Sequence, residues 1–444
     1  MADPRCLPAV AASTALALTL VACVSSSSEP DPSETGVKVT TGASVGEETQ
    51  PEEPTSIPSE TVTGPESSEP AETGTEPDAS AETSGGGVSE HLTGSPSRYG
   101  ARPGPVDRRI SRMSLRDKAR QLVAVAFSGT TAPGRLIRTL HPGGLIYFSD
   151  NVQRNAQIRA MSARVQRIAR RTGEPLLLMT DQEGGLVTRL PGTSDVPGGA
   201  EFGGDARWAR RTAKRTGELM DRLGIGVNLA PIADVNTVGN AGVIGSRSFS
   251  SDPDVASRLV RAQVCGYHAG GIATTVKHFP GHGSTATDSH ASTATITKSR
   301  SAWRRTDLPP FASAVRARVD LIMLGHLALP AFDPSGRPAT ISPQLNRRLL
   351  RERLGYEGVV VSDALNMGGI TSWGSSRQIA VRAIKSGVDL LLMPPQPAEA
   401  VRGVVEAVRD GRLSERRLNA SVERVLALKQ RLGLYRAAEQ LPRC

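Results

Sequence analysis

The stretch that organises this sequence reads Lys277-His278-Phe279-Pro280-Gly281-His282-Gly283 and continues, after a short gap, with Asp288-Ser289-His290. A β-branched run over 273–276 leads into it and predicts a strand that ends at Lys277. The Pro-Gly-His-Gly segment suits neither a strand nor a helix, so it predicts a loop. Several titratable side chains on a loop at a strand end are typical of a functional site, because binding groups sit on loops that a rigid scaffold holds.

Asp288 and His290 are the chemically most specific pair in this loop. They are two residues apart and point the same way if the loop is extended. A carboxylate beside an imidazole fixes its tautomer and favours its protonated form, which suits proton transfer near neutral pH. A lone Asp-x-His more often ties a loop to itself, but the whole constellation from Lys277 to His290 favours catalysis.

The chain begins with a stretch that does not belong to a fold. Residues 1–22 are largely apolar and lead into Leu20-Val21-Ala22-Cys23, which resembles a bacterial lipoprotein cleavage box. The apolar run is short for a membrane span, which needs about 20 residues. The resemblance implies a signal peptide over 1–22, a lipid on Cys23, and an exported protein anchored to the outer face of the cytoplasmic membrane. The alternative is an uncleaved anchor.

Residues 23–98 are rich in Ser, Thr, Glu, Pro and Gly and contain almost no aliphatic side chains. Such a segment buries too little apolar surface to offset the entropy of ordering, so it predicts a disordered tether. We expect the folded part to span residues 99–444.

The two parts differ sharply in charge. From Tyr99 onward, basic residues exceed acidic ones by 22, whereas the linker is acidic. A basic domain is compatible with nucleic acid. Aromatic side chains for base stacking are scarce, however, and an excess of Arg also attracts anionic wall polymers. We therefore expect no nucleic-acid partner.

Cysteines and histidines do not form a recognisable metal or disulfide pattern. Once Cys23 carries lipid, Cys265 and Cys444 remain in the expected folded part, and whether they pair is open. His278 and His282 are four residues apart, but the intervening Pro-Gly prevents a shared helix face. We expect neither a metal nor a cofactor.

From Tyr99 onward, apolar runs of strand length alternate with stretches of helical periodicity. The predicted strands are Leu122–Phe127, Gly144–Phe148, Leu176–Asp181, Val227–Pro231, Thr274–Phe279, Leu321–Gly325, Val359–Asp363 and Leu390–Met393. The predicted helices are Gln153–Arg171, Ala206–Leu223, Asp254–Ala269, Leu308–Val319, Pro343–Leu354, Ser376–Ser386, Pro397–Asp410 and Ser414–Arg431.

Eight apolar strands that mostly alternate with helices predict an α/β fold, a single (β/α)8 TIM-type barrel. The alternative is an open parallel sheet, but no Gly-x-Gly-x-x-Gly follows the first strand. One barrel without large apolar surface signals suggests a monomer. In such a barrel the functional residues lie where strands end. Polar residues do lie there: Asp181, Lys277, His278 and Asp363 close predicted strands, and Asp234 and His326 follow them.

Several motifs in order make Arg109–Leu434 resemble the glycoside hydrolase family 3 β-N-acetylhexosaminidases of the NagZ type. Lys277–His290 looks like the family signature, and Met113–Leu122 is similar to its opening helix. Further matches are Asp181-Gln182-Glu183-Gly184-Gly185 with Arg189, Ala230–Val235, Gly245–Phe249 and Ser362-Asp363-Ala364-Leu365-Asn366-Met367. Ala364 departs from many relatives, which have a second Asp there.

The resemblance implies a retaining exo-glycosidase that removes terminal non-reducing β-linked N-acetylglucosamine. By position, Asp363 matches the nucleophile that forms a covalent glycosyl-enzyme, and His290, supported by Asp288, matches the general acid/base. Asp181, Arg189, Arg247, Lys277 and His278 match the substrate-binding positions. The implied substrates are peptidoglycan-derived fragments, with the aglycone left open.

Two other functions fit the same residues. A β-N-acetylglucosaminide phosphorylase would use an identical site, because a deprotonated imidazole repels an anionic acceptor less than a carboxylate does. A non-catalytic, wall-sugar-binding lipoprotein would keep the pocket but would not need Asp363, Asp288 and His290 together. A two-domain β-glucosidase would need a sandwich domain, for which we find no segment in this sequence.

Overall fold

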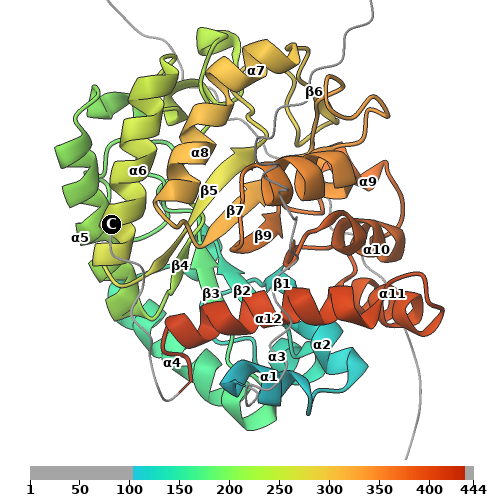
Figure 1. The fold of residues 1–444 in the computed structure, drawn as a ribbon. Coiled ribbons are helices and arrows are strands. Elements are labelled where there is room, and N and C mark those ends of the chain that lie inside the picture. Colours follow the sequence, from blue (N-terminus) through green and yellow to red (C-terminus); the bar gives the residue numbers. More distant parts are fainter. Residues whose placement is uncertain (1–103, 436–444) are drawn as a thin grey trace, which may run out of the picture. The chain divides into compact units, whose positions relative to one another are not determined.

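The computed structural model describes residues 104–435, which form an eight-stranded parallel barrel inside a layer of helices (Figure 1). The strand order is β10-β1-β2-β3-β4-β5-β7-β9, and a parallel bridge between Val361 and Leu390 joins the two ends. The predicted (β/α)8 barrel is therefore confirmed. The proposed signal peptide, Cys23, the linker and Cys444 lie outside the described residues.

All eight predicted strands are present; seven are shorter than predicted, and β5 begins one residue earlier. They are β1 (Val123–Ala126), β2 (Gly144–Tyr147), β3 (Leu177–Thr180), β4 (Val227–Asn228), β5 (Ala273–Phe279), β7 (Leu321–Leu324), β9 (Val359–Ser362) and β10 (Leu391–Leu392). Every residue of β2, β3, β5, β7 and β9 is buried. Burial on both faces explains why these strands read as continuous apolar runs instead of alternating ones.

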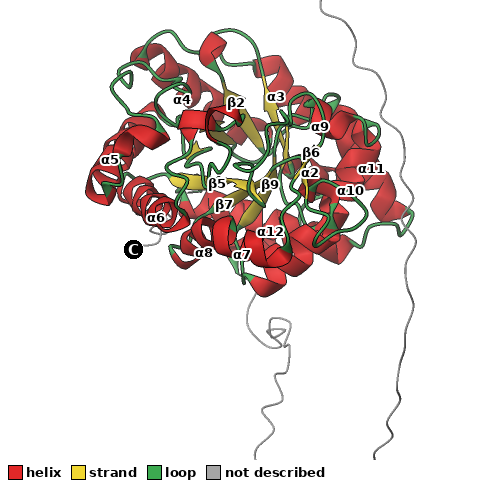
Figure 2. Cartoon of the chain, turned by 90° about the horizontal axis from the view of Figure 1, so that it is seen from above, coloured by secondary structure: helices red, strands yellow, loops and turns green. Residues whose placement is uncertain are grey.

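Helices surround the barrel when it is seen from above (Figure 2). They are α1 (Pro105–Ile110), α2 (Leu115–Gln121), α3 (Gly134–Leu140), α4 (Asn155–Thr172), α5 (Ala206–Leu223), α6 (Pro253–Ala269), α7 (Arg300–Thr306), α8 (Leu308–Arg316), α9 (Gly368–Thr371), α10 (Ser376–Ser386), α11 (Pro397–Arg409) and α12 (Glu415–Arg431). Within the described residues, no helix is long and apolar enough to cross a membrane.

The chain also contains shorter elements outside the barrel strands and α-helices. The 3-10 segments are η1 (Ser149–Asn151), η2 (Gly199–Phe202), η3 (Gly239–Ala241), η4 (Gly245–Arg247) and η5 (Ala339–Ile341). The segment η6 (Gln344–Arg353), predicted as an α-helix, is a π-helix. A second small sheet pairs β6 (Ala294–Thr295) with β8 (Leu327–Ala328).

Local sequence signals explain most helix ends. Asp205 begins α5 by accepting a hydrogen bond from the Trp208 N–H, and Gly224 ends it in the left-handed conformation. The sequence did not predict α1, α3, α7 and α9, each of which has seven residues or fewer. A helix of that length is shorter than the window of about 11–18 residues over which apolar periodicity is informative.

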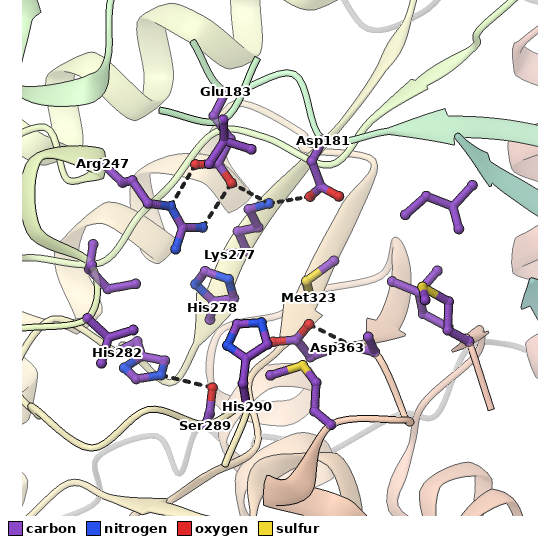
Figure 3. Close-up of a pocket in the computed structure, with 18 of the residues that line it drawn as sticks. Asp181, Glu183, Arg247, Lys277, His278, His282, Ser289, His290, Met323 and Asp363 are labelled. Atoms are coloured by element: carbon purple, nitrogen blue, oxygen red, sulfur yellow. Dashed lines mark hydrogen bonds and ion pairs between the residues drawn. The ribbon is translucent and has the colours of Figure 1, made fainter. Parts of the chain in front are cut away.

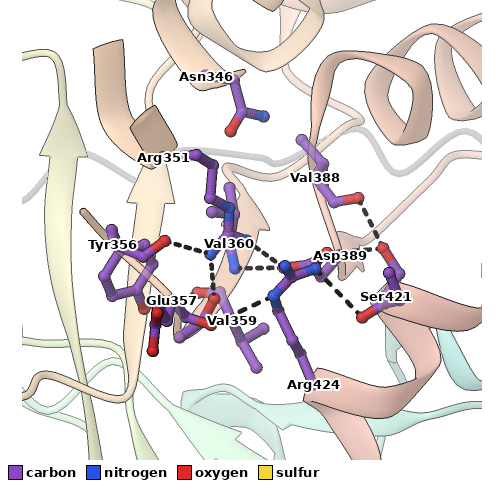
Figure 4. A network of polar contacts seen from close by, with 12 residues as sticks. Asn346, Arg351, Tyr356, Glu357, Val359, Val360, Val388, Asp389, Ser421 and Arg424 are labelled. Carbon is purple, nitrogen blue, oxygen red and sulfur yellow. Dashed lines mark hydrogen bonds and ion pairs between the residues drawn. The ribbon is translucent and has the colours of Figure 1, made fainter. Parts of the chain in front are cut away.

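A buried carboxylate, Asp389, joins elements at the end of the barrel where the strands begin (Figure 4). It precedes β10, is fully buried, and accepts hydrogen bonds from the Val360 N–H at 3.0 Å and the Ser421 hydroxyl at 2.6 Å. Arg351, Arg417 and Arg424 form ion pairs with it. Burial raises the pKa of Asp389, but the three guanidinium groups outweigh that effect and lower the pKa below its ordinary value.

This network predicts a large loss of stability in Asp389→Ala, because three arginines would lose their buried counter-charge. We expect the free energy of unfolding to fall by about 3–5 kcal/mol. Denaturant titration of the purified protein measures it. The control is Asp410→Ala, which removes an exposed pair with Arg412 and should cost less than about 1 kcal/mol. Equal losses in the two variants would contradict the role given to Asp389.

Candidate active site

A cavity of about 470 Å³ opens at the carboxyl ends of the barrel strands (Figure 3). Its apolar lining includes Ile146 of β2, Met323 of β7 and Leu392 of β10. Its polar lining brings together seven of the eight predicted catalytic and substrate-binding residues: Asp181, Arg189, Arg247, Lys277, His278, His290 and Asp363. The eighth, Asp288, contacts His290.

Lys277 and His278 are consecutive residues of β5, yet both line the cavity. Successive side chains of a regular strand point to opposite faces. Here the pairing of β5 with β7 shifts register between Val276 and Phe279. The irregular end of β5 therefore gives the cavity two neighbouring polar groups.

Glu183 is the centre of a buried ion network that the sequence analysis did not single out. Its carboxylate accepts two hydrogen bonds of 2.9 Å from the Arg247 guanidinium and lies 2.7 Å from Lys277 Nζ. The same Nζ donates to Asp181 Oδ1 at 2.6 Å. Only 7% of the Glu183 side chain is exposed, compared with 19% for Asp181. Asp181 is thus the carboxylate of this network that a ligand reaches.

The charges in this network reinforce one another. Burial raises the pKa of Glu183, but Lys277 and Arg247 outweigh it and lower that pKa to about 2. Burial lowers the pKa of Lys277, yet Asp181 and Glu183 hold it above its ordinary value. Hence Glu183 is a carboxylate and Lys277 an ammonium at neutral pH. A set of paired charges avoids the cost of burying any of them alone.

Asp234 orients His278. The pKa of Asp234 is raised by burial but lowered overall by His278, so the group is ionised and can only accept hydrogen bonds. It accepts from the backbone N–H of His278, from His278 Nδ1 at 2.7 Å, and from the backbone N–H of His282. Since Nδ1 donates to Asp234, the Nε2 atom of His278 is left for a ligand.

Asp363 follows β9 and is partly exposed to the cavity. Its Oδ1 accepts the backbone N–H of Ala364 at 2.8 Å. Burial raises the pKa of Asp363, but His278, His326, that N–H group and Lys277 together lower it, so the carboxylate is ionised. His326 holds the next residue, with Nε2 3.0 Å from the carbonyl oxygen of Ala364.

Asp288 and His290 lie in a tight turn instead of the extended segment that we considered. Asp288 Oδ1 accepts the backbone N–H of His290 at 2.9 Å and lies 2.8 Å from His290 Nδ1. Asx turns of this kind are a common use of aspartate. The backbone N–H of His290 and then burial are the main influences on the pKa of Asp288, which is lowered overall. Because ionised Asp288 accepts from Nδ1, the Nε2 atom of His290 is free to act in the cavity.

Arg189 reaches the cavity from the segment after β3. Its backbone N–H donates to Gln182 Oε1 at 2.9 Å, and its guanidinium lies over the ring of Phe148. Its buried Nε atom has no hydrogen-bond partner among the described residues. Arg189 therefore has donor capacity left for a ligand.

The predicted substrate-binding residues thus converge. Sequence reasoning named Asp234 and His326 only as polar residues at strand ends, and it gave no role to His282 or Glu183. Glu183 stood inside a quoted motif, and its position between Asp181 and Arg189 was the only signal. Among the described residues, no group of three or more His, Cys, Asp or Glu side chains is arranged to hold a metal ion. Cys265 of α6 is disulfide-bonded, and the other cysteines lie outside the described residues.

Comparison with known proteins identifies the family. The profile of the glycosyl hydrolase family 3 N-terminal domain matches residues 114–428. The chain belongs to glycosyl hydrolase family 3. This assignment covers the whole barrel, including every residue described in the cavity.

Named relatives of this family 3 chain are β-hexosaminidases. Beta-hexosaminidase A of Pseudoalteromonas piscicida is 35% identical over 336 residues, which are 68% of this chain and 56% of that protein. The beta-hexosaminidase of Alkalilimnicola ehrlichii is 38% identical over 290 residues, 62% of this chain and 80% of that protein. This chain therefore spans little more than half the length of the first relative.

A solved structure agrees with the barrel. The family 3 β-N-acetylglucosaminidase from Paenibacillus sp. str. FPU-7 superposes with a TM-score of 0.71 at 40% identity, covering 74% of this chain and 65% of that one. At this identity the likeness extends to the sequence as well as the fold.

The Glu183 network predicts a pH-dependent loss of stability. Because the folded-state pKa of about 2 lies below the ordinary value of 4.5, ionised Glu183 stabilises the fold at pH values above 4.5. That contribution disappears as the pH falls from 4.5 towards 2. We expect Glu183→Gln to be less stable than the parent by about 3 kcal/mol near neutral pH. The difference should shrink steadily below pH 4.5.

Denaturant titrations of both proteins at a series of pH values measure this difference. Glu218→Gln, which removes an exposed pair with Lys214 on α5, is the control and should change stability by less than about 1 kcal/mol. A parent-to-variant difference that stays constant down to pH 2.5 would show that the Glu183 charge does not stabilise the fold.

Proposed function

We propose that this protein is a retaining exo-β-N-acetylglucosaminidase that removes terminal non-reducing N-acetylglucosamine from peptidoglycan-derived fragments. The observation that carries the proposal is one cavity holding the ionised Asp363 carboxylate together with His290, whose Nδ1 is engaged by Asp288. Retention of configuration requires such a nucleophile on one side of the anomeric carbon and a proton donor beside the leaving oxygen. The family and the β-hexosaminidase relatives support the activity.

In the first step the Asp363 carboxylate attacks the anomeric carbon, and the bond to the glycosidic oxygen breaks. Protonated His290 gives its Nε2 proton to that oxygen, so the aglycone leaves as a neutral alcohol. The product is a covalent glycosyl ester of Asp363. Asp288 accepts the Nδ1 proton throughout, which leaves Nε2 as the nitrogen that gives and takes the proton.

In the second step neutral His290 accepts a proton from water through Nε2 while the water oxygen attacks the anomeric carbon. The ester bond breaks and the Asp363 carboxylate is restored. Two inversions give net retention. The negative charge on the departing carboxylate is stabilised by His278, His326, Lys277 and the backbone N–H of Ala364, the groups that lower the pKa of Asp363.

The sugar is held by charged groups that are already in place. Asp181 accepts hydrogen bonds from sugar hydroxyls, while Lys277, Arg189 and Arg247 donate them, and charge-assisted bonds are roughly twice as strong as neutral ones. Ile146, Met323 and Leu392 supply apolar contact for the sugar ring. Paired cations do not rearrange when the sugar arrives, which favours pre-organised binding.

The cellular setting is part of the same proposal. Lipidation of Cys23 would anchor the protein to the outer face of the cytoplasmic membrane, and the acidic linker of residues 23–98 would carry the barrel into the wall. The basic charge of the barrel favours contact with anionic wall polymers over long distances. The natural partners would be wall fragments that carry N-acetylglucosamine, with no nucleic acid, and the barrel would act as a monomer.

Phosphorolysis is the second candidate. His290 is neutral when the glycosyl ester forms, so the acid/base imidazole itself adds no negative charge that would repel phosphate. The accessible side chain of His290, which is 69% exposed, also leaves room for an acceptor larger than water. In that case phosphate oxygen attacks the anomeric carbon and sugar 1-phosphate leaves.

The catalytic roles predict different losses in two variants. Asp363→Asn should abolish turnover, because the other two carboxylates that line the cavity, Asp181 and Glu183, are paired with Lys277. His290→Ala should lower kcat/KM by roughly 10²–10⁴-fold on a substrate with a poor leaving group. Activated aryl N-acetylglucosaminides should lose much less, because their leaving groups need no proton. Steady-state kinetics on a matched pair of substrates measure both effects. Equal losses on the two substrates would refute the acid/base role of His290.

The reaction product shows whether water or phosphate is the acceptor. The full-length protein, incubated with an aryl N-acetylglucosaminide with and without phosphate, should release free N-acetylglucosamine in both conditions. Anion-exchange chromatography separates free sugar from sugar 1-phosphate. Sugar 1-phosphate as the main product would make the protein a phosphorylase with the same site. No release by folded protein would support a wall-sugar-binding lipoprotein.

A further inference from the structure

The proposed proton donor has little contact of its own with the protein. The side chain of His290 is 69% exposed and that of Asp288 is 49% exposed. By contrast, the intervening Ser289 is buried, with 3% of the residue exposed. The position of His290 is therefore set by its contacts with Asp288, by the buried Ser289 and by the backbone of the loop.

Two consecutive glycines donate hydrogen bonds to the backbone of this loop. The N–H of Gly368 donates to the carbonyl oxygen of His290 at 2.7 Å, and the N–H of Gly369 donates to that of Ser289 at 3.1 Å. Both glycines begin α9, a few residues after Asp363 on the same segment. The segment with the nucleophile thus also holds the loop with the acid/base.

Neither glycine leaves room for a side chain. A Cβ atom on Gly369 would lie 2.6 Å from the Ser289 carbonyl oxygen and 3.0 Å from His326 Cβ. One on Gly368 would lie 2.3 Å from the carbonyl oxygen of Ala291. Neither residue has a positive φ, so the close approach of the loop, and not the backbone conformation, excludes larger residues here.

His282 contacts the side chain of Ser289 (Figure 3). Its Nε2 atom lies 3.0 Å from the Ser289 hydroxyl, and its backbone N–H donates to Asp234 at 2.7 Å. The ring is buried, and burial lowers its pKa, so it is neutral at neutral pH. A neutral, buried ring whose own backbone N–H is bonded to Asp234 is a fixed support.

We propose that Gly368, Gly369 and His282 form a loop dock, a set of positioning residues that hold Ser289 and so place His290 Nε2 for proton transfer opposite Asp363. This inference rests on the proposed function. The dock binds no substrate and carries no proton. It fixes the proton donor relative to the nucleophile, and misplacement by about 1 Å is enough to slow such a transfer by up to about 10²-fold.

The test uses Gly369→Ala and Ser289→Ala in the full-length protein, each alone and combined with His290→Ala. On a substrate with a poor leaving group, Gly369→Ala should lower kcat/KM by about 10–100-fold. Ser289→Ala, which removes only the contact with His282, should lower it by a few-fold. On an activated aryl substrate both losses should be small, because the leaving group needs no proton.

The double variants give the decisive readout. If the dock acts only through His290, neither substitution lowers kcat/KM further once His290 is already alanine. Azide should also raise kcat of Gly369→Ala on the activated substrate, since azide attacks the glycosyl ester without giving up a proton. The bond from the anomeric carbon to Asp363 then breaks, and glycosyl azide is the product.

Gly226→Ala is the matched control, because a Cβ there would lie in ordinary contact, 3.4 Å from Leu432. It should keep parental kinetics on both substrates. Equal losses of Gly369→Ala on both substrates, or losses that multiply with that of His290→Ala, would overturn the dock while parental activity upholds the proposed function. A parent that releases no sugar would overturn both. If Gly369→Ala does not fold, the same comparison is made with Ser289→Ala alone and Ser289→Ala combined with His290→Ala.

Discussion

The site depends on one buried carboxylate, Glu183, which holds Lys277 and Arg247 in place at the rim of the barrel. Both cations come from segments distant in sequence, β5 and η4, and neither would be stable near the barrel axis without a counter-charge. Because Glu183 is hardly exposed, it neutralises them without competing for ligand. The more exposed Asp181 shares Lys277 and remains available to accept hydrogen bonds from a sugar.

The opposite end of the barrel shows the same chemistry used for stability. Asp389 is surrounded by three arginines, a serine hydroxyl and a backbone N–H, which occupy both of its oxygens. It also joins β9, β10 and α12, the elements that close the barrel. In barrels of this kind the carboxyl ends of the strands carry function and the amino ends carry stability. Glu183 and Asp389 follow that division, since one network faces a cavity and the other faces packed elements.

Much of this organisation could be predicted from sequence, and the exceptions have physical causes. Eight apolar runs predicted the barrel. Polar residues at the ends of these runs predicted the cavity, because all strands of a parallel barrel end on the same rim. Helix α3 was missed because it is too short to show a period. The glycines of the loop dock were missed because nothing in Gly368-Gly369 itself indicates which chain segment approaches it. The ion pair between Glu183 and Arg247 could not be predicted either. The order of the motifs places their residues on the rim, but it does not show which side chains contact one another.

The two proposed catalytic groups are held in opposite ways, and the two steps of the reaction explain why. Asp363 must attack and leave along one line, so a position at the cavity wall fixed by the Ala364 N–H suits it, and His326 holds the next peptide. His290 must first release an aglycone and then admit an acceptor beside the same nitrogen. A buried donor would obstruct that exchange, whereas an exposed ring on a loop fixed by its backbone allows it. Exposure removes the packing that usually positions a catalytic side chain. The proposed loop dock binds the neighbouring Ser289 and two carbonyl oxygens. It thereby positions the imidazole without covering it.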